Sequence, residues 1–100
     1  MIKISIRYKK TGEFLSLTLT GHANSAPKGE DLVCAAVSGI ILGGINALSG
    51  KNYQIKEEGN LELSNIGEIS SHDSIVIETI IAQLSAVARD NPKYVKISVE

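Results

Sequence analysis

The chain has 100 residues and a formal net charge of −1 at neutral pH, which is the size of one domain and too little for two. Hydrophobic residues make up 43% and charged residues 21% of it, as in a soluble globular protein. The ten lysines and arginines are spread along the sequence. We therefore expect no direct nucleic-acid binding, because affinity for phosphates comes from clustered cations.

The cysteine content and the pattern of the amino terminus predict the cellular compartment of the protein. A single cysteine, Cys34, cannot form an internal disulfide, which suits a reducing compartment. The amino terminus alternates apolar and polar residues, unlike the continuous apolar core of a signal peptide. The longest apolar stretch, residues 32–45, is interrupted by Ser38 and by glycines and is shorter than the roughly 20 residues that span a bilayer. We expect a cytoplasmic protein without a membrane partner.

The first thirty residues predict a hairpin followed by a loop. Apolar and polar residues alternate over residues 2–8 and again over 14–20, which indicates two half-buried strands joined by a turn and paired antiparallel. Gly21 ends the second strand, so His22 is expected at its tip. The loop that follows is rich in turn residues, and we expect it to be mobile and to close over a substrate; it comprises Ala23, Asn24, Ser25, Ala26, Pro27, Lys28, Gly29 and Glu30.

A helix is expected from about Leu32 to Leu48, with Asp31 as its N-cap. Ser38 and Asn46 are the only polar side chains within it, so the helix is apolar nearly all round and must be covered on more than one side. The sheet can cover one side only. The remaining surface is expected to meet the second helix, a partner subunit, or both.

The rest of the chain predicts a second hairpin, a second helix and a last strand. Residues 53–56 and 61–64 flank a turn that contains Gly59 and Asn60. Apolar residues recur every three or four positions from Ser71 to Asp90, which predicts an amphipathic helix capped by Ser71 or Asp73. Residues 95–99 alternate as a strand. The order ββαββαβ predicts an α+β, two-layer sandwich with a mostly antiparallel sheet and two helices, in a single domain over residues 1–100.

The chemically informative stretch runs from Gly21 to Ser38. Cys34 falls in the first turn of the expected helix, where the amides and the helix dipole favour a thiolate and can also donate to an oxyanion. His22, at the strand tip, could take the thiol proton and return it to a leaving group. A lone cysteine is also a common small core residue, and a lone histidine a common surface residue. The residues alone leave the nucleophilic and the structural interpretations both open.

Asp31 and Ser38, on either side of Cys34 in the sequence, are candidates for secondary roles. Asp31 either caps the helix, which we favour, or orients the His22 imidazole as the third member of a triad. Ser38, one turn after Cys34, either supports the thiol by a hydrogen bond or permits close packing, the commoner case. His72 is expected at the surface. Cys34, His22 and Asp31 are of zinc-ligand types but lack a metal-binding spacing, so we expect neither a metal nor a cofactor.

The motif Gly21-His22-Ala23, a short loop to Gly29, then Asp31 and Val33-Cys34-Ala35-Ala36-Val37-Ser38, resembles the signature of the ribosomal-processing cysteine protease family, Prp. The resemblance extends over the whole chain. It implies that Cys34 is the nucleophile and His22 its general base. It also implies a homodimer that removes the N-terminal extension of a large-subunit ribosomal protein by cutting after an aromatic pair. Because the loop at residues 23–28 is variable in such proteins, the resemblance implies nothing about substrate preference from this loop.

Two other classes of function are open at this stage. A non-catalytic, ribosome-associated binding module would keep Cys34 as a core residue. It predicts a slow, ordinary reaction of that thiol with iodoacetamide. A thiol-dependent acyl transferase or hydrolase of a small substrate would have a pocket too narrow for an extended peptide.

Overall fold

The computed structural model describes residues 1–21, 31–57 and 60–100. The expected order ββαββαβ and the α+β class are confirmed. The elements along the chain are β1 (Ile2–Tyr8), β2 (Phe14–Thr20), α1 (Leu32–Asn46), β3 (Tyr53–Lys56), β4 (Leu61–Asn65), α2 (Ser71–Asp90) and β5 (Val95–Val99).

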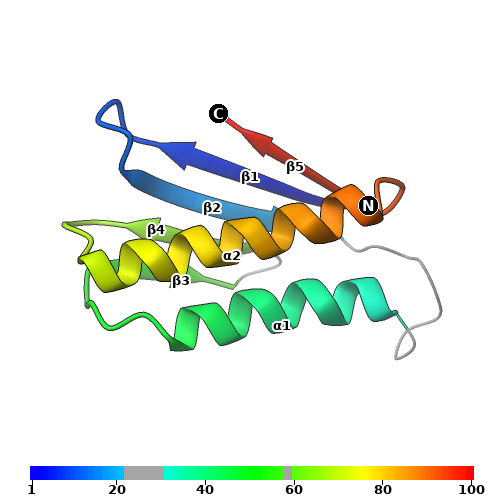
Figure 1. Ribbon diagram of the computed structural model, residues 1–100, viewed down its shortest axis with the longest axis horizontal. Coiled ribbons are helices and arrows are strands. Elements are labelled where there is room, and N and C mark those ends of the chain that lie inside the picture. Colours follow the sequence, from blue (N-terminus) through cyan, green and yellow to red (C-terminus); the bar gives the residue numbers. More distant parts are fainter. Residues whose placement is uncertain (22–30, 58–59) are drawn as a thin grey trace.

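The five strands form one sheet in the order β3-β4-β2-β1-β5. The pairs β1–β2, β2–β4 and β3–β4 are antiparallel, whereas β5 runs parallel to β1. The sheet is therefore mixed but mostly antiparallel. Both helices lie side by side on one face of it (Figure 1), which gives the two layers expected from the sequence.

The register of the strands explains the core. Ile4 pairs with Leu19 and Ile6 with Leu17, so the apolar residues of β1 and β2 share the face that the helices cover. Alternation thus determines which side chains are buried. The buried hydrophobic residues form one cluster: Ile2, Ile4, Ile6, Phe14, Leu17, Val37, Ile41, Leu63, Ile77, Ile80, Leu84, Ala88 and Val95.

The two helices approach each other closely at Gly44. A Cβ atom at this position would meet the side chain of Ile80, which is buried on α2, whereas a Cβ atom at the neighbouring Gly43 would meet nothing within 4 Å. The second helix therefore covers one flank of α1, as expected.

These adjacent glycines give a matched pair of substitutions. Gly44→Ala is expected to lower the free energy of unfolding by about 1–3 kcal/mol, because the added Cβ atom would press on the Ile80 side chain, which is buried in the core. Gly43→Ala is expected to raise it by up to about 1 kcal/mol, because alanine is the better helix former. Urea denaturation of both variants measures the difference. Equal effects would contradict the close helix contact.

The caps differ from expectation at two points. Ser70, and neither Ser71 nor Asp73, is the N-cap of α2, and its hydroxyl accepts a hydrogen bond from the amide of Asp73 at 3.1 Å. The expected cap was wrong because serine and aspartate cap helices about equally well and three of them occur within four positions. Helix α1 ends at Asn46, two residues earlier than expected.

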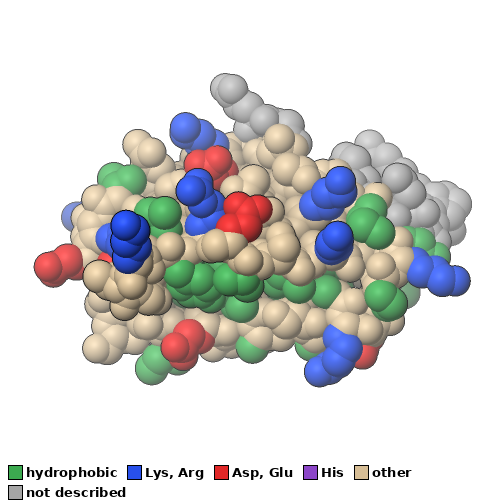
Figure 2. All heavy atoms as spheres, turned by 90° about the horizontal axis from the view of Figure 1, so that it is seen from above, with side chains coloured by type: hydrophobic (Ala, Val, Ile, Leu, Met, Phe, Trp, Pro, Cys, Tyr) green, Lys and Arg blue, Asp and Glu red, His purple; other side chains and the backbone are tan. Residues whose placement is uncertain are grey.

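The surface shows no gathering of cations on the face that Figure 2 presents. Lysine and arginine side chains are spread over that face, with acidic side chains among them (Figure 2). No helix in the described part of the chain is long and apolar enough to cross a membrane.

Candidate active site

Cys34 is the third residue of α1 and lies at the boundary between core and solvent. Its side chain is half-buried and packs against the edge of the hydrophobic core. Helix α1 contains no charged residue, so its first turn has no acidic side chain inside it. The thiol is thus held by packing but is not enclosed in the interior.

Asp31 is the N-cap of α1. Its backbone is extended, with φ −78° and ψ 93°, and its carboxylate accepts a hydrogen bond from the amide of Cys34 at 3.1 Å. The amide of Ala35 donates to the Asp31 carbonyl, also at 3.1 Å. These bonds occupy the amides of Cys34 and Ala35. Among the described residues, the amides of Leu32 and Val33 are the other donors at the start of the helix, where amides have no acceptor within the helix.

Two substitutions of Asp31 separate helix capping from a catalytic role. Asp31→Ala is expected to lower the free energy of unfolding by about 1 kcal/mol, because the Cys34 amide loses its acceptor. Asp31→Asn keeps an acceptor oxygen and is expected to retain stability and most of the activity. Thermal unfolding and peptide turnover measure the two effects. A stable but inactive Asp31→Asn variant would assign the carboxylate to the catalytic machinery instead.

His22 and the expected substrate loop, residues 23–30, lie outside the described residues. The chain leaves β2 through Gly21, whose φ of 83° is in the left-handed region. A Cβ atom there would collide with the carbonyl oxygen of Met1. Gly21 is therefore a position that only glycine can fill, as well as the end of the strand.

Ser38 is exposed, one turn after Cys34 on α1. With residues from two strands it lines a cavity of about 110 Å³ between the helix and the sheet; the lining residues are Leu19, Ser38, Ile41, Leu42 and Leu61. The sequence singled out Ser38 but not the two strand leucines, because their meeting depends on the pairing of β2 with β4, which a local pattern does not contain.

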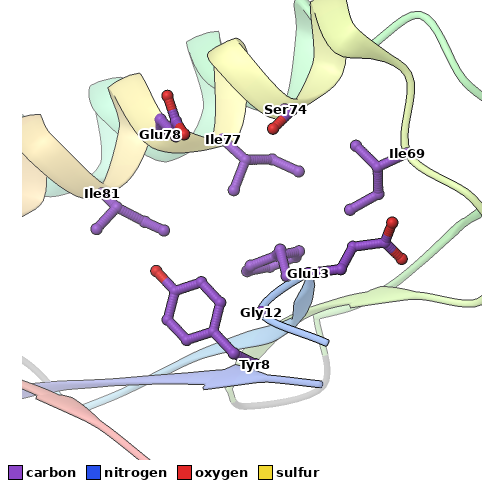
Figure 3. A pocket seen from close by; sticks show the side chains of 9 residues that line it. Tyr8, Gly12, Glu13, Ile69, Ser74, Ile77, Glu78 and Ile81 are labelled. Carbon is purple, nitrogen blue, oxygen red and sulfur yellow. The ribbon is translucent and has the colours of Figure 1, made fainter. Parts of the chain in front are cut away.

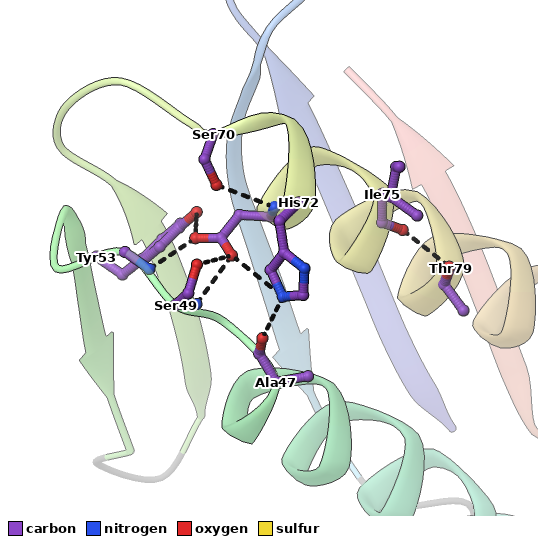
Figure 4. A network of polar contacts seen from close by, with 9 residues as sticks. Ala47, Ser49, Tyr53, Ser70, His72, Ile75 and Thr79 are labelled. Carbon is purple, nitrogen blue, oxygen red and sulfur yellow. Dashed lines mark hydrogen bonds and ion pairs between the residues drawn. The ribbon is translucent and has the colours of Figure 1, made fainter.

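Asp73 has a larger structural role than the sequence predicts. Its side chain is completely buried and accepts hydrogen bonds from the Ser49 amide at 2.8 Å, the Ser49 hydroxyl at 3.0 Å, the Gly50 amide at 2.8 Å and the Tyr53 hydroxyl at 3.0 Å (Figure 4). This cluster joins the segment between α1 and β3 to the start of α2.

The hydrogen bonds, above all the one from the Ser49 backbone, hold the pKa of the Asp73 carboxyl at about 2, against an ordinary value of 3.8. Burial first, and then the bond to Asp73, raise the pKa of Tyr53 from 10.0 to about 12. His72 is exposed, as expected, and its Nε2 contacts the carbonyl oxygen of Ala47 at 3.0 Å. The carbonyl accepts only, so the imidazole donates.

A second cavity, of about 120 Å³, lies at the opposite end of the molecule from the start of α1 (Figures 1 and 3). The turn after β1 and the first half of α2 form it, and the side chains of Tyr8, Ile77 and Ile81 converge there (Figure 3). None of the candidate site residues lines this cavity.

The model of one protein family, described as cysteine protease Prp, matches residues 1–96. The chain belongs to the Prp family. Two relatives named ribosomal processing cysteine protease Prp agree with this. The Bacillus subtilis protein is 34% identical over 100 residues, covering 90% of this chain and 89% of the relative. The Mycoplasma pneumoniae protein is 30% identical over 97 residues, covering 95% and 91%. By this membership the chain is a cysteine protease, and both relatives are named for the processing of ribosomal protein.

Solved structures confirm the Prp fold. The Staphylococcus aureus Prp protease, crystallised with a covalently linked product peptide, superposes with a TM-score of 0.93 over 100% of both chains at 20% identity. A Streptococcus mutans protein superposes with a TM-score of 0.75 at 27% identity, covering 99% of this chain and 93% of the other.

Proposed function

We propose that this protein removes the N-terminal extension of a large-subunit ribosomal protein, with Cys34 as nucleophile and His22 as general base, in a protease domain that spans residues 1–100. The observation that carries the assignment of the nucleophile is the position of Cys34 in the first turn of α1, half-buried at the edge of the core. The ribosomal substrate is supported by the relatives, which are named ribosomal processing cysteine proteases.

The proposed reaction has two steps. The Cys34 thiolate attacks the carbonyl carbon of the scissile peptide bond, and a C–S bond forms. The C–N bond then breaks, and the leaving amine takes the proton that His22 had accepted from the thiol. The product of this step is a thioester on Cys34. Water, deprotonated by His22, hydrolyses that thioester to a carboxylate and regenerates the thiol.

The oxyanion of each tetrahedral intermediate needs donors close to the sulfur. The amide of Cys34 donates to Asp31, so the amides of Leu32 and Val33 are the proposed donors. The negative charge of Asp31 lies beside the same turn and opposes the favourable effect of the helix dipole on a thiolate. We therefore assign Asp31 to holding the geometry of the turn.

For selectivity we propose residues 23–30, which lie outside the described residues, as the segment that recognises bulky apolar side chains of the substrate. Ser38 supports the site by its small size beside Cys34. The reaction takes place in the cytoplasm, needs no cofactor or metal, and involves neither a nucleic acid nor a membrane. The single cysteine, which cannot form an internal disulfide, supports this location.

We also propose that the protein is a homodimer, paired through the outer face of α1. That face consists of small and apolar residues without charge, among them Leu32, which is 80% exposed, and Ala35 and Gly39. At 100° per residue these positions point away from the residues that pack on α2 and the sheet. An exposed apolar helix face of this kind is typical of a protein interface.

A charge on this face should separate the subunits without unfolding them. Gly39→Glu introduces a side chain into open space, since a Cβ atom there meets nothing within 4 Å. We expect dimer affinity to fall by roughly 100-fold, because two like charges would face each other across the two-fold axis. Analytical ultracentrifugation measures this, with Ser85→Glu on the exposed side of α2 as control. A Gly39→Glu variant that stays dimeric would exclude this face.

The test of the proposed function is cleavage of a precursor peptide with Phe-Phe before the cut, followed by mass spectrometry of the products. We expect a single cut after the aromatic pair, and no cut when both aromatic residues are replaced by alanine. Cleavage of a small ester or thioester but of no peptide would instead support a small-substrate hydrolase.

A further inference from the structure

The cavity at the far end of the molecule from Cys34 has the size of a single side chain. It has a volume of about 120 Å³ and lies between the turn after β1 and the first half of α2 (Figure 3). Sites for small molecules typically measure about 300–1,000 Å³, whereas an enclosed cavity of about 150 Å³ holds benzene. The cavity therefore has room for one side chain of a partner and not for a metabolite.

The floor of this cavity is apolar and its rim is acidic. Phe14 and Ile77, which are 5% and 4% exposed, belong to the hydrophobic core, and the half-exposed ring of Tyr8 forms a wall (Figure 3). Glu13 comes from the turn and Glu78 from α2, so each of the two elements brings a carboxylate to the lining. Among the described residues, no lysine or arginine lines the cavity. This chemistry matches a side chain with an apolar stem and a cationic end, which is that of lysine and arginine.

Both carboxylates can accept further hydrogen bonds. The Nζ of Lys9 donates to Oε1 of Glu13 at 3.0 Å, and the side-chain amide of Asn65 donates to the same oxygen at 3.5 Å. The Lys9–Glu13 ion pair is more than a third exposed, so it is weak. Glu78 is exposed, and its carboxylate has no ion-pair partner in the part of the chain that the structure describes. Lys9 thus balances one negative charge, and Glu78 leaves the cavity with a net negative charge that a cation would pair with.

The cavity is remote from the proposed nucleophile. A helix rises about 1.5 Å per residue, so Cys34 lies about 18 Å from the end of α1 at Asn46. The segment after that end contacts the start of α2, where Nε2 of His72 is 3.0 Å from the carbonyl oxygen of Ala47, and Ser74 of the same turn of α2 lines the cavity. An extended chain advances about 3.3 Å per residue, so about five residues reach only about 17 Å. A group in the cavity therefore belongs to a part of the substrate more than five residues from the cut.

We propose that this cavity is an exosite, in which one lysine or arginine side chain of the ribosomal protein docks at a distance from the bond that is cut. The inference rests on the proposed function, because it takes a ribosomal protein as the substrate. Proteins that bind RNA carry clustered lysine and arginine, so such a substrate is complementary in charge to the acidic rim. The stem of the docked side chain covers Tyr8 and Ile77, and its cationic end pairs with Glu78 and Glu13.

The test compares two probes that differ in their reach. In a Cys34→Ala background, isothermal titration calorimetry measures the affinity for the full-length precursor protein and for a peptide with about five residues on each side of the cut. Glu78→Lys is expected to weaken binding of the precursor by roughly 10-fold, because a repelling charge replaces an attracting one. The affinity for the short peptide should stay within about twofold of its original value. Asp90→Lys makes the same change of charge at the exposed end of α2 and should leave both affinities unchanged.

A second variant tests the apolar part of the cavity. Ser74→Leu fills the cavity without a change of charge and should also weaken binding of the precursor, whereas Ser85→Leu, outside the lining, should not. Circular dichroism confirms that each variant is folded. The exosite is overturned if Glu78→Lys binds the precursor as tightly as the parent protein does, if both probes weaken equally, or if the precursor does not bind.

Two further outcomes separate this proposal from its alternatives. A change of oligomeric state in Ser74→Leu, measured by analytical ultracentrifugation, would show that the cavity holds a second copy of this chain, which overturns the exosite. If the protein with Cys34 intact binds the precursor in a manner that depends on Glu78 but does not cut it, the exosite stands and the proposed function is refuted.

Discussion

Replacing Cys34 by alanine is expected to abolish cleavage of the precursor peptide, with kcat/KM lower by roughly 10⁴-fold or more, as for other enzymes that lose their covalent nucleophile. The free energy of unfolding should change by no more than about 1 kcal/mol, because the side chain is only half-buried and an alanine fits the same helix position. Stopped or continuous cleavage assays and urea denaturation measure the two quantities.

The matched control is Cys34→Ser, which keeps the size and the hydrogen-bonding capacity of the side chain but exchanges the thiol for a hydroxyl, a much weaker nucleophile at neutral pH. We expect this variant to be as inactive as Cys34→Ala and as stable as the parent protein. A Cys34→Ser variant that still cleaves at the original rate would mean that Cys34 is a packing residue and that the nucleophile lies elsewhere.

Replacing Asp73 by asparagine is expected to lower Tm by roughly 10 °C at pH 7. One carboxylate accepts bonds from two backbone amides and two hydroxyls, and an amide side chain cannot accept all four. At least one buried donor is then left without an acceptor. Ser49→Ala is the control, because it removes only the hydroxyl donor and should cost a fraction of this. A Tm for Asp73→Asn equal to that of the parent protein would contradict the cluster.

The Asp73 cluster also predicts a dependence of stability on pH. The folded-state pKa of Asp73, about 2, is below the ordinary 3.8, so the folded state favours the ionised carboxylate. Its contribution is complete above pH 3.8 and is lost as pH falls from about 4 to 2. The difference in Tm between the parent protein and Asp73→Asn should therefore shrink over that interval. Tyr53 behaves in the opposite sense, since its raised pKa makes its contribution fall as pH rises from 10 to 12.

Much of the fold was predictable because its information is local. Alternation over residues 2–8 and 14–20 and the three-to-four spacing over 71–90 each determine an element and its buried face. The parallel pairing of β5 with β1 was not predictable, because the pattern of a strand specifies its faces and not its neighbours. The N-cap of α2 was missed because Ser70 and Ser71 are adjacent and are both serines, so the residue type does not distinguish them.

The candidate site was predictable where one element determines it. Cys34 was expected in the first turn of a helix with Asp31 ahead of it, and that is where both residues lie. The sequence predicted Asp73 only as a possible helix cap. Its burial was missed, because the contact with Ser49, 24 residues earlier, leaves no trace in the local sequence. The leucines opposite Ser38 were missed for the same reason, and the geometry of His22 lies outside the described residues.

The most direct measurement is the rate and the position of labelling by a peptide chloromethyl ketone that carries the sequence before the cut. The tryptic fragment of residues 29–51 contains Cys34, so mass spectrometry locates the adduct. We expect a single adduct, on Cys34. The reagent should alkylate Cys34 much faster than it alkylates a free thiol such as glutathione, and precursor peptide should prevent the reaction. A rate for Cys34 no higher than the rate for glutathione, or an adduct on any other residue, would contradict the assignment of Cys34 as the nucleophile.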